Sequence, residues 1–325
     1  MNVFADLSVL IVSWNQAERL AACLEAVLRF LPGAQVVAVD NGSEPPLRFP
    51  AGVSAVRIRE NLGYAGGNQA GFVRCTRPFV LLLNNDALLP SAAPVQTLLA
   101  FLKEHACVAA AQAALRLPDG SLDACGECFT PAGVLFHRGY RQPVGRWLDA
   151  PAPVLAGKGA CLLVRRQAVE QAGGLFRPDF FCYYEDIDLG HRLWLAGYEV
   201  WFVPTEPVLH DERATSRTLS DRFVWRHYLS NMLSSALDLW GWRAWVRMGP
   251  GFLCACLIGA CAKGVLPCIR RKRLPFRRAA AERDFLPRVT VRVPWRYYFG
   301  LGRRVLTGSM RSFASGKKKS VDIFR

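Results

Sequence analysis

An apolar run at residues 79–83 ends in two amides and a carboxylate, Asn84, Asn85 and Asp86. A strand this apolar is typical of the centre of a parallel sheet, and open α/β sheets bind ligands at the carboxyl ends of their strands. A carboxylate there suits a divalent cation, because magnesium takes one or two protein oxygens and completes its shell with water and phosphate. The alternative is a loop aspartate that caps the next helix.

A second carboxylate, Asp40, follows another apolar run at residues 35–39. Because parallel strands end at the same edge of a sheet, we expect Asp40 to lie on the edge that holds Asp86. There it can accept a hydrogen bond from a nucleobase N–H or a ribose hydroxyl. The alternative is an Asx turn, which the Asp-Asn-Gly-Ser sequence at 40–43 can form without any ligand.

Three acids, Glu185, Asp186 and Asp188, open a predicted helix over residues 185–196. The helix dipole favours ionised carboxylates there and lowers their pKa values. Residues two apart point to nearly opposite sides, so Asp186 and Asp188 cannot both face one substrate, and Asp188 is placed to pair with Arg192. Glu185 and Asp186 remain free to take the proton of a hydroxyl. The alternative is that all three acids stabilise the start of the helix.

His210 follows a predicted strand at residues 199–203 and the apolar pair Val208 and Leu209. Imidazole is an acceptable ligand of manganese or magnesium where a site is short of carboxylates, as residues 84–86 are. We therefore expect His210 to join Asp86, the alternative being a purely structural histidine.

A glycine-rich segment at residues 63–71 allows a backbone to approach a ligand such as phosphate closely. It lacks the Lys-Ser/Thr of a P-loop and the spacing of a GxGxxG motif. The alternative is a helix packed tightly on the sheet.

The elements that position these residues alternate in type along the chain. The alternation predicts an α/β fold with a mostly parallel, doubly wound sheet flanked by helices. Residues 120–155 are rich in Gly and Pro and show no periodicity. The expected strands are 7–12, 35–39, 53–58, 79–83, 108–117, 154–165 and 199–203, with helices at 15–31, 90–105 and 185–196.

Positive charge is concentrated near the C-terminal end of the chain. The chain has 325 residues and a net charge of +15. Residues 263–325 hold 18 Lys and Arg against 3 Asp and Glu, while residues 1–262 hold 23 basic and 23 acidic residues. A basic region beside a neutral body is typical of proteins held on an anionic membrane surface. Nucleic acid is the competing partner, because aromatic residues lie among the arginines. Eleven cysteines, an odd number, indicate reduced thiols in the cytosol.

An uncharged apolar stretch at residues 249–262 precedes the basic region, and Lys263 and Pro267 interrupt its continuation to residue 269. It is shorter than the roughly 20 residues that span a bilayer, so we expect an in-plane or re-entrant membrane helix. A true span and a buried core helix are the alternatives. The predicted division is a catalytic domain at 1–235 and a helical, basic, membrane-associating region at 236–325.

Five short motifs in order make residues 7–235 resemble the family 2 glycosyltransferases of GT-A fold, and within them the bacterial rhamnosyltransferase-like branch. Each motif is weak alone, and their order makes the resemblance specific. The motifs are Ile11-Val12-Ser13-Trp14-Asn15, Val39-Asp40-Asn41-Gly42-Ser43, Asn61-Leu62-Gly63-Tyr64-Ala65-Gly66-Gly67-Asn68, Leu82-Leu83-Asn84-Asn85-Asp86 and Phe181-Cys182-Tyr183-Tyr184-Glu185-Asp186-Ile187-Asp188-Leu189, the last leading to Gly197-Tyr198 and His210.

The resemblance implies a nucleotide-diphosphate sugar donor, a hydroxyl acceptor and inversion at the anomeric carbon. Asp186 would be the catalytic base, with Glu185 beside it. Asp86 and His210 would hold a divalent metal, Mg or Mn, on the diphosphate, and Asp40 would contact the nucleobase. The other donor-binding residues that the motifs imply are Ser13, Trp14, Asn15, Asn61, Gly63, Gly67, Asn68, Asn84 and Asn85.

The chain departs from the family pattern in three places. Ser13-Trp14-Asn15 stands where members often have Thr-Tyr-Asn, and residues 84–86 stand where they often have Asn-Pro-Asp. The first carboxylate of a DxD pair is therefore absent, and metal binding depends on one acid. Residues 173–177 lack the usual Phe-Asp-Glu, which affects the acceptor side. Because Asp186 is retained, we expect an active enzyme.

The expected function is an inverting glycosyltransferase that adds a sugar to a lipid-linked glycan in cell-envelope or O-antigen-type polysaccharide synthesis. Rhamnose from dTDP-rhamnose is the leading donor, on resemblance alone. We expect peripheral binding to the cytoplasmic face of a bacterial inner membrane and no nucleic-acid partner. One alternative is a sugar nucleotidylyltransferase, but this class needs a basic, Gly-rich loop, and residues 11–18 do not provide one. The other is a non-enzymatic protein that uses only its basic tail.

Overall fold

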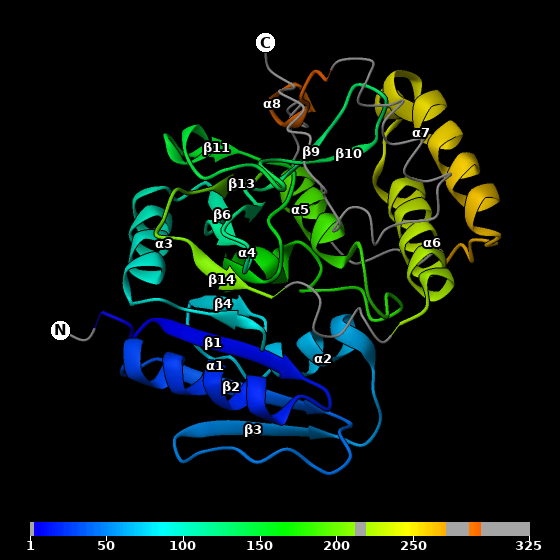
Figure 1. Ribbon diagram of the computed structural model, residues 1–325. Helices are drawn as coiled ribbons and strands as arrows, with labels where there is room; N and C mark the ends of the chain where they lie inside the picture. The colour runs from blue at the N-terminus through cyan, green and yellow to red at the C-terminus, as the bar shows by residue number, and fades with distance from the viewer. Residues whose placement is uncertain (1–2, 212–218, 271–285, 294–325) are drawn as a thin grey trace.

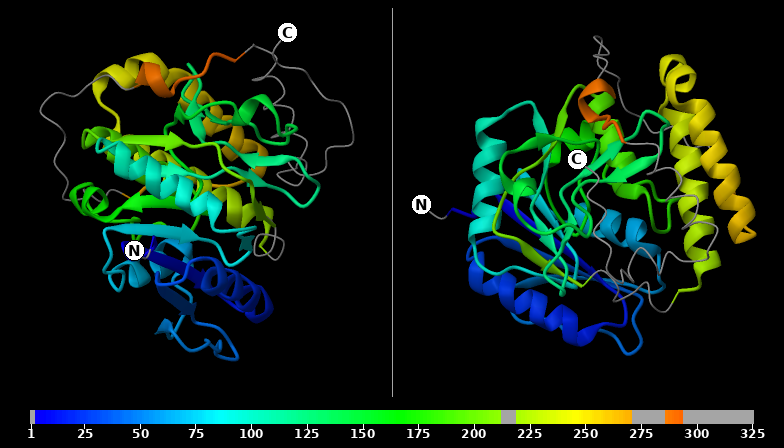
Figure 2. Two further views of the ribbon diagram at one scale, coloured as in Figure 1. Left: turned by 90° about the vertical axis from the view of Figure 1, so that its left-hand side faces the viewer. Right: turned by 45° about the horizontal axis from the view of Figure 1, so that its top comes forward.

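The computed structural model describes residues 3–211, 219–270 and 286–293. An eight-stranded sheet runs through the molecule in the order β11-β13-β6-β12-β4-β1-β2-β3. Helices cover both of its faces (Figures 1 and 2). This architecture confirms the α/β fold predicted from the sequence.

The N-terminal half of the sheet is parallel, as expected. β1 (Leu7–Ser13) lies between β2 (Gln35–Asn41) and β4 (Phe79–Leu83), and β3 (Val53–Ile58) pairs with β2. The register sets Ser13 opposite Asp40. The motifs that follow β1, β2 and β4 therefore share the carboxyl edge of the sheet.

The other half of the sheet corrects the expectation of a mostly parallel arrangement. β12 (Cys161–Arg165) runs antiparallel between β4 and β6 (Val108–Gln112), and β13 (Glu199–Phe202) pairs parallel with β6. A parallel connection needs a long crossover, usually a helix, and no α-helix lies between β6 and β12. Because the chain reaches β12 from the carboxyl edge of β4, that strand enters the sheet in the opposite direction. β11 (Ala152–Pro153) completes the edge next to β13.

Short strands occur in the region 120–155, which the sequence left unassigned, and pair with other short strands outside it. They form a four-stranded and a two-stranded sheet, and a 3-10 turn, η1 (Arg146–Leu148), follows the two-stranded sheet in the chain. Strands of two or three residues are too short to show an alternating pattern, so the sequence did not predict them separately; only Leu115 and Arg116 fall inside a predicted strand, 108–117. The strands are β5 (Ala87–Leu88), β7 (Leu115–Arg116), β8 (Leu122–Ala124) and β14 (Val208–His210) in one sheet, and β9 (Glu127–Phe129) and β10 (Leu135–His137) in the other.

Two hydrophobic clusters lie on opposite faces of the main sheet. Side chains alternate between them along β1, where Leu10 joins one cluster and Ile11 the other. α1 (Ala17–Phe30) and α3 (Ala93–Glu104) cover one face. The opposite face packs against α2 (Gly63–Phe72), α4 (Arg166–Gln171) and α5 (Glu185–Leu195).

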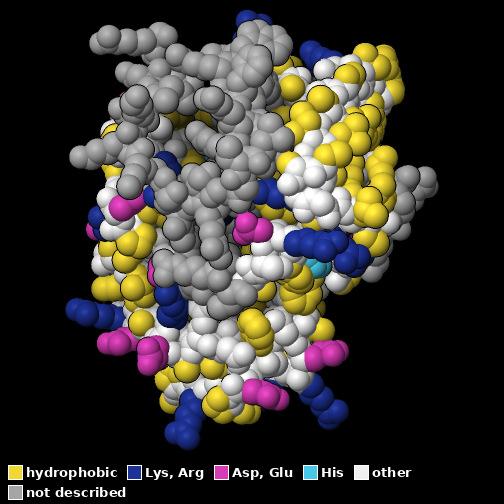
Figure 3. Space-filling model, turned by 45° about the vertical axis from the view of Figure 1, so that its right-hand side comes forward, with side chains coloured by type: hydrophobic (Ala, Val, Ile, Leu, Met, Phe, Trp, Pro, Cys, Tyr) yellow, Lys and Arg dark blue, Asp and Glu magenta, His cyan; other side chains and the backbone are white. Residues whose placement is uncertain are grey.

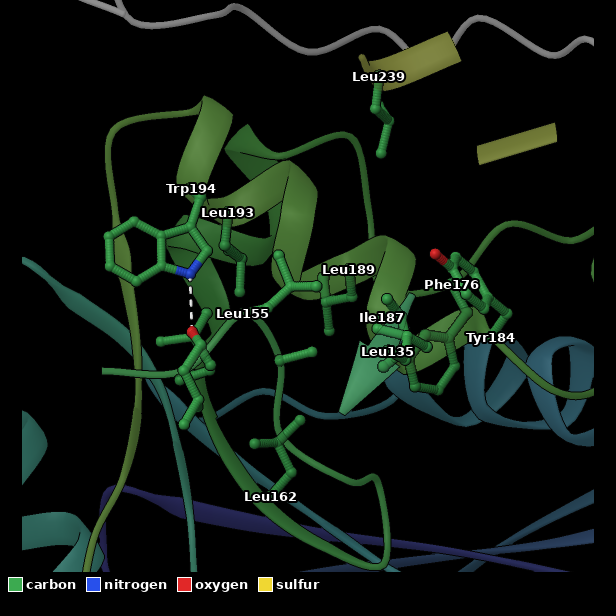
Figure 4. Close-up of a cluster of buried hydrophobic side chains, with 14 of the residues drawn as sticks. Leu135, Leu155, Leu162, Phe176, Tyr184, Ile187, Leu189, Leu193, Trp194 and Leu239 are labelled. Carbon is green, nitrogen blue, oxygen red and sulfur yellow. Dashed lines mark hydrogen bonds between the residues drawn. The ribbon is translucent and has the colours of Figure 1, made fainter. Parts of the chain in front are cut away.

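Helix α5 is almost wholly buried, as Figure 4 shows for Leu189, Leu193 and Trp194. Trp194 Nε1 donates a hydrogen bond to the carbonyl oxygen of Val154 at 2.9 Å. A helix enclosed in this way gives the side chains at its first turn a fixed position.

Helices α6 (Asp221–Leu239) and α7 (Trp242–Lys263) lie side by side along one flank of the molecule (Figures 1 and 2). Leu239 and Phe252 belong to the same hydrophobic cluster as α5. Residue 235, the expected domain boundary, lies inside α6, so the structure shows no break there. A short helix, α8 (Leu286–Val289), follows a gap in the described residues.

Helix α7 is long and apolar enough to cross a membrane, with an 18-residue window of mean hydropathy 1.4. It includes the predicted apolar stretch, but it begins earlier, at Trp242, and ends before Gly264. Only 33% of that window is buried in the protein. Most of the basic region, residues 271–285 and 294–325, lies outside the described residues.

Candidate active site

Asp86 and His210, the expected metal ligands, come together at the carboxyl edge of β4. The pairing of β14 with β5 sets His210 opposite Ala87. His210 Nε2 lies 3.4 Å from Asp86 Oδ1 and 3.4 Å from Asn84 Nδ2. The sequence correctly predicted that these residues gather, and metal binding by them stays a prediction.

A buried carboxylate, Asp123, holds His210 from the other side. Its Oδ2 accepts a hydrogen bond from His210 Nδ1 at 2.7 Å, and Lys158 Nζ donates to its two oxygens at 2.7 and 2.9 Å. When the ring is neutral, its lone pair is then on Nε2, which faces Asp86. Burial disfavours the charged ring, but contacts with Asp123 and Asp86 outweigh burial and raise the pKa of His210 to about 9. Although burial opposes ionisation of Asp123, Lys158 and His210 hold its pKa below the usual range.

The donor set at this cluster fits a divalent cation that shares its shell with a substrate. Asn84 Oδ1 and Asp86 Oδ1 are buried, and apart from the approach of His210 neither accepts a hydrogen bond from a described residue. Unpaired buried oxygens are costly, and a cation would satisfy them. No group of three or more His, Cys, Asp or Glu side chains within 3–211, 219–270 and 286–293 could hold a metal by itself. Phosphate oxygens and water would therefore supply the remaining ligands.

Asp186, the expected base, lies in the first turn of α5. Its Oδ1 accepts a hydrogen bond from the Ile187 amide at 2.9 Å, and its Oδ2 accepts one from the Gly159 amide at 3.4 Å. Burial, reinforced by the charge of Glu127, raises the pKa of Asp186 to about 6. The sequence predicted a lowered pKa from the helix dipole. The dipole contributes at most about 2 kcal/mol, whereas burial can shift a pKa by up to about 3–5 units, so burial prevails.

Glu185 is buried beside Asp186, and its Oε2 accepts no hydrogen bond from a described residue. Burial and the adjacent charge of Asp186 raise the pKa of Glu185 well above its ordinary value. A raised pKa disfavours the ionised form that a base needs, and a catalytic role of Glu185 alongside Asp186 stays a prediction.

The turn that leads into α5 has an unusual backbone conformation. Tyr183 and Tyr184 have φ angles of 68° and 74°, in the left-handed region. For bulky residues such angles cost about 1–3 kcal/mol each and persist only when the surroundings enforce them. The turn sets where α5 begins, and hence where Asp186 lies.

One segment, residues 158–160, connects the His210 cluster to the base. Lys158 binds Asp123, the Gly159 amide donates to Asp186, and the carbonyl oxygen of Ala160 accepts a hydrogen bond from the Asn84 amide at 3.1 Å. The metal candidates and the base candidate therefore flank the same stretch of backbone.

Sequence reasoning did not find the roles of Lys158 and Asp123. The Gly-Lys-Gly sequence at 157–159 marked only the start of a strand, and Asp123 lies in the unperiodic region. The only available indication was a lysine and an aspartate among apolar residues, because their contact depends on the pairing of β7 with β8 and of β12 with β6.

Asp40 is buried in a turn at the end of β2. Its oxygens accept hydrogen bonds from the Ser43 amide at 3.0 Å, the Leu47 amide at 2.9 Å and the Arg57 guanidinium at 3.1 Å. This is the turn-forming role that the sequence left open as the alternative. Contact of Asp40 with a nucleobase stays a prediction.

The loops after β1, β2 and β4 are tied together by side chains. Asn85 Nδ2 donates to Ser13 Oγ at 2.9 Å. The Asn15 amide donates to Ser43 Oγ, and Asn15 Oδ1 accepts from the Glu44 amide, both at 2.9 Å. Trp14, between Ser13 and Asn15 in the sequence, is half-buried. The carboxyl edge is thus a connected surface where a donor can bind.

The glycine-rich segment forms helix α2 packed on the sheet, the alternative reading of the sequence. A side chain at Gly67 would lie 2.7 Å from Val12, and Asn68 is buried with its amide bonded to the Tyr64 carbonyl. Gly67 and Asn68 therefore take part in packing, and their contact with a donor stays a prediction.

Asn61 and Gly63 begin this segment at the carboxyl edge. Asn61 Oδ1 accepts hydrogen bonds from Asn41 Nδ2 and the Gly63 amide. Gly63 has a φ of 73°, and a Cβ there would meet the Phe181 carbonyl oxygen at 2.1 Å, so only glycine fits. This contact brings α2 against the turn that precedes Asp186.

The family model described as "Glycosyltransferase like family 2" matches residues 5–229, which is more than half of the chain. The chain belongs to this family. The geometry at the carboxyl edge is therefore the candidate active site of a glycosyltransferase.

Characterised relatives resemble parts of this glycosyltransferase. N-acetylglucosaminyl-diphospho-decaprenol L-rhamnosyltransferase of Mycobacterium tuberculosis is 37% identical over 107 residues, which cover 33% of this chain and 31% of that protein. The low-salt glycan biosynthesis hexosyltransferase Agl10 of Haloferax volcanii is 27% identical over 200 residues, which cover 58% of this chain and 61% of that protein. Each match spans less than two thirds of the relative.

Solved structures share the fold of the glycosyltransferase. GalNAc-T7 with UDP, GalNAc and Mn²⁺ has a TM-score of 0.59 at 14% identity, covering 80% of this chain and 51% of that one. Mannosyltransferase PcManGT of Pyrobaculum calidifontis, with GDP-Man and Mn²⁺, has a TM-score of 0.53 at 16% identity, covering 80% and 76%. These likenesses confirm the GT-A fold.

Asp188 pairs with Arg192, as the sequence predicted. Arg192 Nε donates to Asp188 Oδ2 at 2.8 Å, and both side chains are buried. The remaining nitrogens of Arg192 donate to the carbonyl oxygens of residues 172, 174 and 175 at 2.6–2.7 Å. In this glycosyltransferase the pair therefore fixes the loop at 172–175 against α5.

Proposed function

We propose that the glycosyltransferase transfers a sugar from a nucleotide-diphosphate donor to a hydroxyl with inversion, and that rhamnose from dTDP-rhamnose is the leading donor. The main support is the placement of Asp186 and the Asp86–His210 cluster on either side of residues 158–160. The partial likeness to a rhamnosyltransferase supports the choice of sugar.

Asp186 performs the proton transfer in this proposal. With a pKa of about 6, its carboxylate is mostly ionised at neutral pH and can accept the proton of an acceptor hydroxyl. The hydroxyl oxygen attacks the anomeric carbon while the bond from that carbon to the phosphate oxygen breaks. The bonding electrons leave with the nucleotide diphosphate. A single displacement inverts the anomeric carbon and needs no covalent enzyme intermediate.

The cluster at the end of β4 would hold a divalent metal, Mg or Mn, through Asp86, His210 Nε2 and Asn84 Oδ1. A metal at this position supplies charge neutralisation for the leaving diphosphate. Support comes from the unpaired buried oxygens of Asn84 and Asp86. GalNAc-T7 and PcManGT, two of the solved structures that share the fold, each contain Mn²⁺.

The proposed acceptor is a lipid-linked glycan for cell-envelope polysaccharide, and the proposed location is the cytoplasmic face of a bacterial inner membrane. The support is the outer face of α7, where large apolar side chains are exposed (Figure 3). The opposite side of α7 packs on α6, so lipid cannot surround the helix, and in-plane binding fits better than a span. The exposed residues are Trp242, Val246, Leu253, Leu257 and Ile258, with Arg243 and Arg247 also at the surface.

The donor can be identified by thermal stabilisation of the purified protein. Nucleotide sugars are screened with Mg²⁺, with Mn²⁺ and with neither, because a ligand that binds the folded state raises its melting temperature. Stabilisation by dTDP-rhamnose that depends on metal supports the proposal. Stabilisation by another nucleotide sugar alone refutes the rhamnose assignment.

The base assignment is tested with the donor so identified. Asp186→Asn should lower transfer by about 10²–10⁴-fold while the donor still stabilises the protein. Asp119→Asn, an exposed carboxylate away from the site, is the matched control. Transfer by Asp186→Asn at the wild-type rate would exclude Asp186 as the base.

A further inference from the structure

The turn at residues 181–184 places the base, and helix α6 contacts this turn along its length. Tyr184 and Tyr228 pack edge to face with ring centroids 5.8 Å apart. Phe181 packs in the same way on Phe223, at 6.0 Å. His227 also packs on Phe181, with ring centroids 5.6 Å apart. Because Phe223, His227 and Asn231 are each four residues apart, one face of α6 lies along the turn.

Asn231 makes the polar contact on this face of α6. Its Nδ2 donates hydrogen bonds to two consecutive carbonyl oxygens, those of Cys182 at 3.0 Å and Tyr183 at 2.8 Å. Asn231 is 2% exposed, so water does not compete for these bonds. These carbonyls belong to Cys182 and to Tyr183, which is the first residue of the turn with a positive φ.

The turn is held from the opposite side by α2. The Ala65 amide donates to the Phe181 carbonyl oxygen at 3.2 Å. A strained conformation persists only where the surroundings enforce it, and these contacts supply that enforcement. An asparagine suits the role because a single amide nitrogen offers two N–H groups, whereas an aspartate of the same shape offers none.

A second contact joins α6 to the catalytic helix one turn further on. Ser235 Oγ donates to Asp188 Oδ1 at 2.8 Å, and Asp188 in turn binds Arg192. The base residue Asp186 lies between the two contacts along the chain. Both the entry to α5 and its first turn are therefore fixed by α6.

We propose that Asn231 is a positioning residue for the transfer reaction, which holds the strained turn at Tyr183 and Tyr184 so that Asp186 faces the acceptor hydroxyl. The activity tests of this proposal rest on the proposed function. The structural test does not, so failure of one can be distinguished from failure of the other.

The structural test compares hydrogen–deuterium exchange in Asn231→Ala and in Ser234→Ala. Ser234 is the matched control because it is buried on the same helix, but its Oγ bonds the Ser230 carbonyl and the Arg270 amide, away from the turn. We expect amides of residues 182–187 to exchange faster in Asn231→Ala only. Unchanged exchange over 182–187 in folded Asn231→Ala would overturn the proposal.

The kinetic test uses the same two variants with dTDP-rhamnose and a membrane lipid extract. A small displacement of a catalytic group can cost about 10²-fold in rate, so Asn231→Ala should lower kcat by about 10–100-fold with the donor KM unchanged. If Asn231 only stabilised the fold, the variant would contain less active enzyme, but the kcat of the folded fraction would be unchanged. Equal kcat values for Asn231→Ala and Ser234→Ala would contradict the proposal.

Rescue by glycine tests the part played by strain. Glycine adopts positive φ readily, so Tyr183→Gly should restore most of the kcat and slow the exchange in the Asn231→Ala background. Failure of Tyr183→Gly to restore either quantity would overturn the proposal. If the wild-type protein does not turn over dTDP-rhamnose, the donor assignment fails, and the exchange experiment still decides the role of Asn231.

Discussion

Asp186 is half-buried, and its pKa of about 6 predicts a measurable pH dependence. The base acts in its ionised form, so kcat/KM should rise with pH through about 6 and level off above about 7. The rise follows one proton, because protonated Asp186 cannot accept the hydroxyl proton. The measurement is kcat/KM for sugar transfer from about pH 5 to about pH 8. A wild-type profile that stays flat down to the acid end would contradict this prediction, and Asp186→Asn should lack the acid limb.

Asp123 is one of the residues whose role the sequence analysis missed, and it leads to a second prediction. Asp123→Asn removes the carboxylate that orients His210 Nε2 toward Asp86. Loss of such an outer partner typically weakens metal affinity by about 10–100-fold. Titration calorimetry with Mn²⁺ measures this directly, without a sugar donor. Asp119→Asn, at an exposed carboxylate, should bind Mn²⁺ as the wild type does.

Helix α5 depends on the buried pair of Asp188 and Arg192, and a third prediction follows from it. Arg192→Met removes the guanidinium that pairs with the buried Asp188 carboxylate, which keeps its hydrogen bond from Ser235, and it releases the carbonyls of the loop at 172–175. Breaking one partner of a buried ion pair typically costs about 3–5 kcal/mol. Urea unfolding should show this loss in the free energy of unfolding. Arg243→Met, on the exposed side of α7, should change it little, and equal losses in both variants would count against the prediction.

The elements that the sequence predicted best are those whose own residues determine them. β1, β2 and β4 are apolar runs buried on both faces, and α5 has a helical pattern that ends at Gly197. The short strands β7 to β10 and the antiparallel direction of β12 depend on pairing between distant segments, which local pattern does not encode.

The candidate site was predictable in the same measure. Asp86 comes just after β4, His210 is the last residue of β14, and Asp186 lies in the first turn of α5. Their positions therefore follow from where these elements end or begin. The raised pKa values of Asp186 and Glu185 were not predictable, because burial by distant residues outweighs the helix dipole. Asn231 was not identified because its partners are backbone carbonyls far away in the sequence.

At the scale of the whole molecule, the exposed face of α7 gives a fourth prediction. Val246 and Leu257 are 70% and 66% exposed on this face. Replacing both by Glu should lower cosedimentation with phosphatidylglycerol vesicles, because the change removes apolar contact and adds charge that an anionic surface repels. Val73→Glu places one glutamate at a 62% exposed valine just after α2, away from α7, and is the control. Equal cosedimentation of the Val246→Glu/Leu257→Glu double variant and the wild type would refute membrane binding by this face.

The inner face of α7 has a practical consequence for anyone preparing this protein. Phe252 and Cys256 are 1% and 4% exposed, and both belong to the cluster that includes α5. A truncation before residue 249 would remove these side chains from the core. Protein that is soluble without detergent is better obtained by replacing the exposed apolar residues of α7 with polar ones. The exposed apolar side chains of α7 can be substituted, whereas the helix itself is part of the folded core and must be kept.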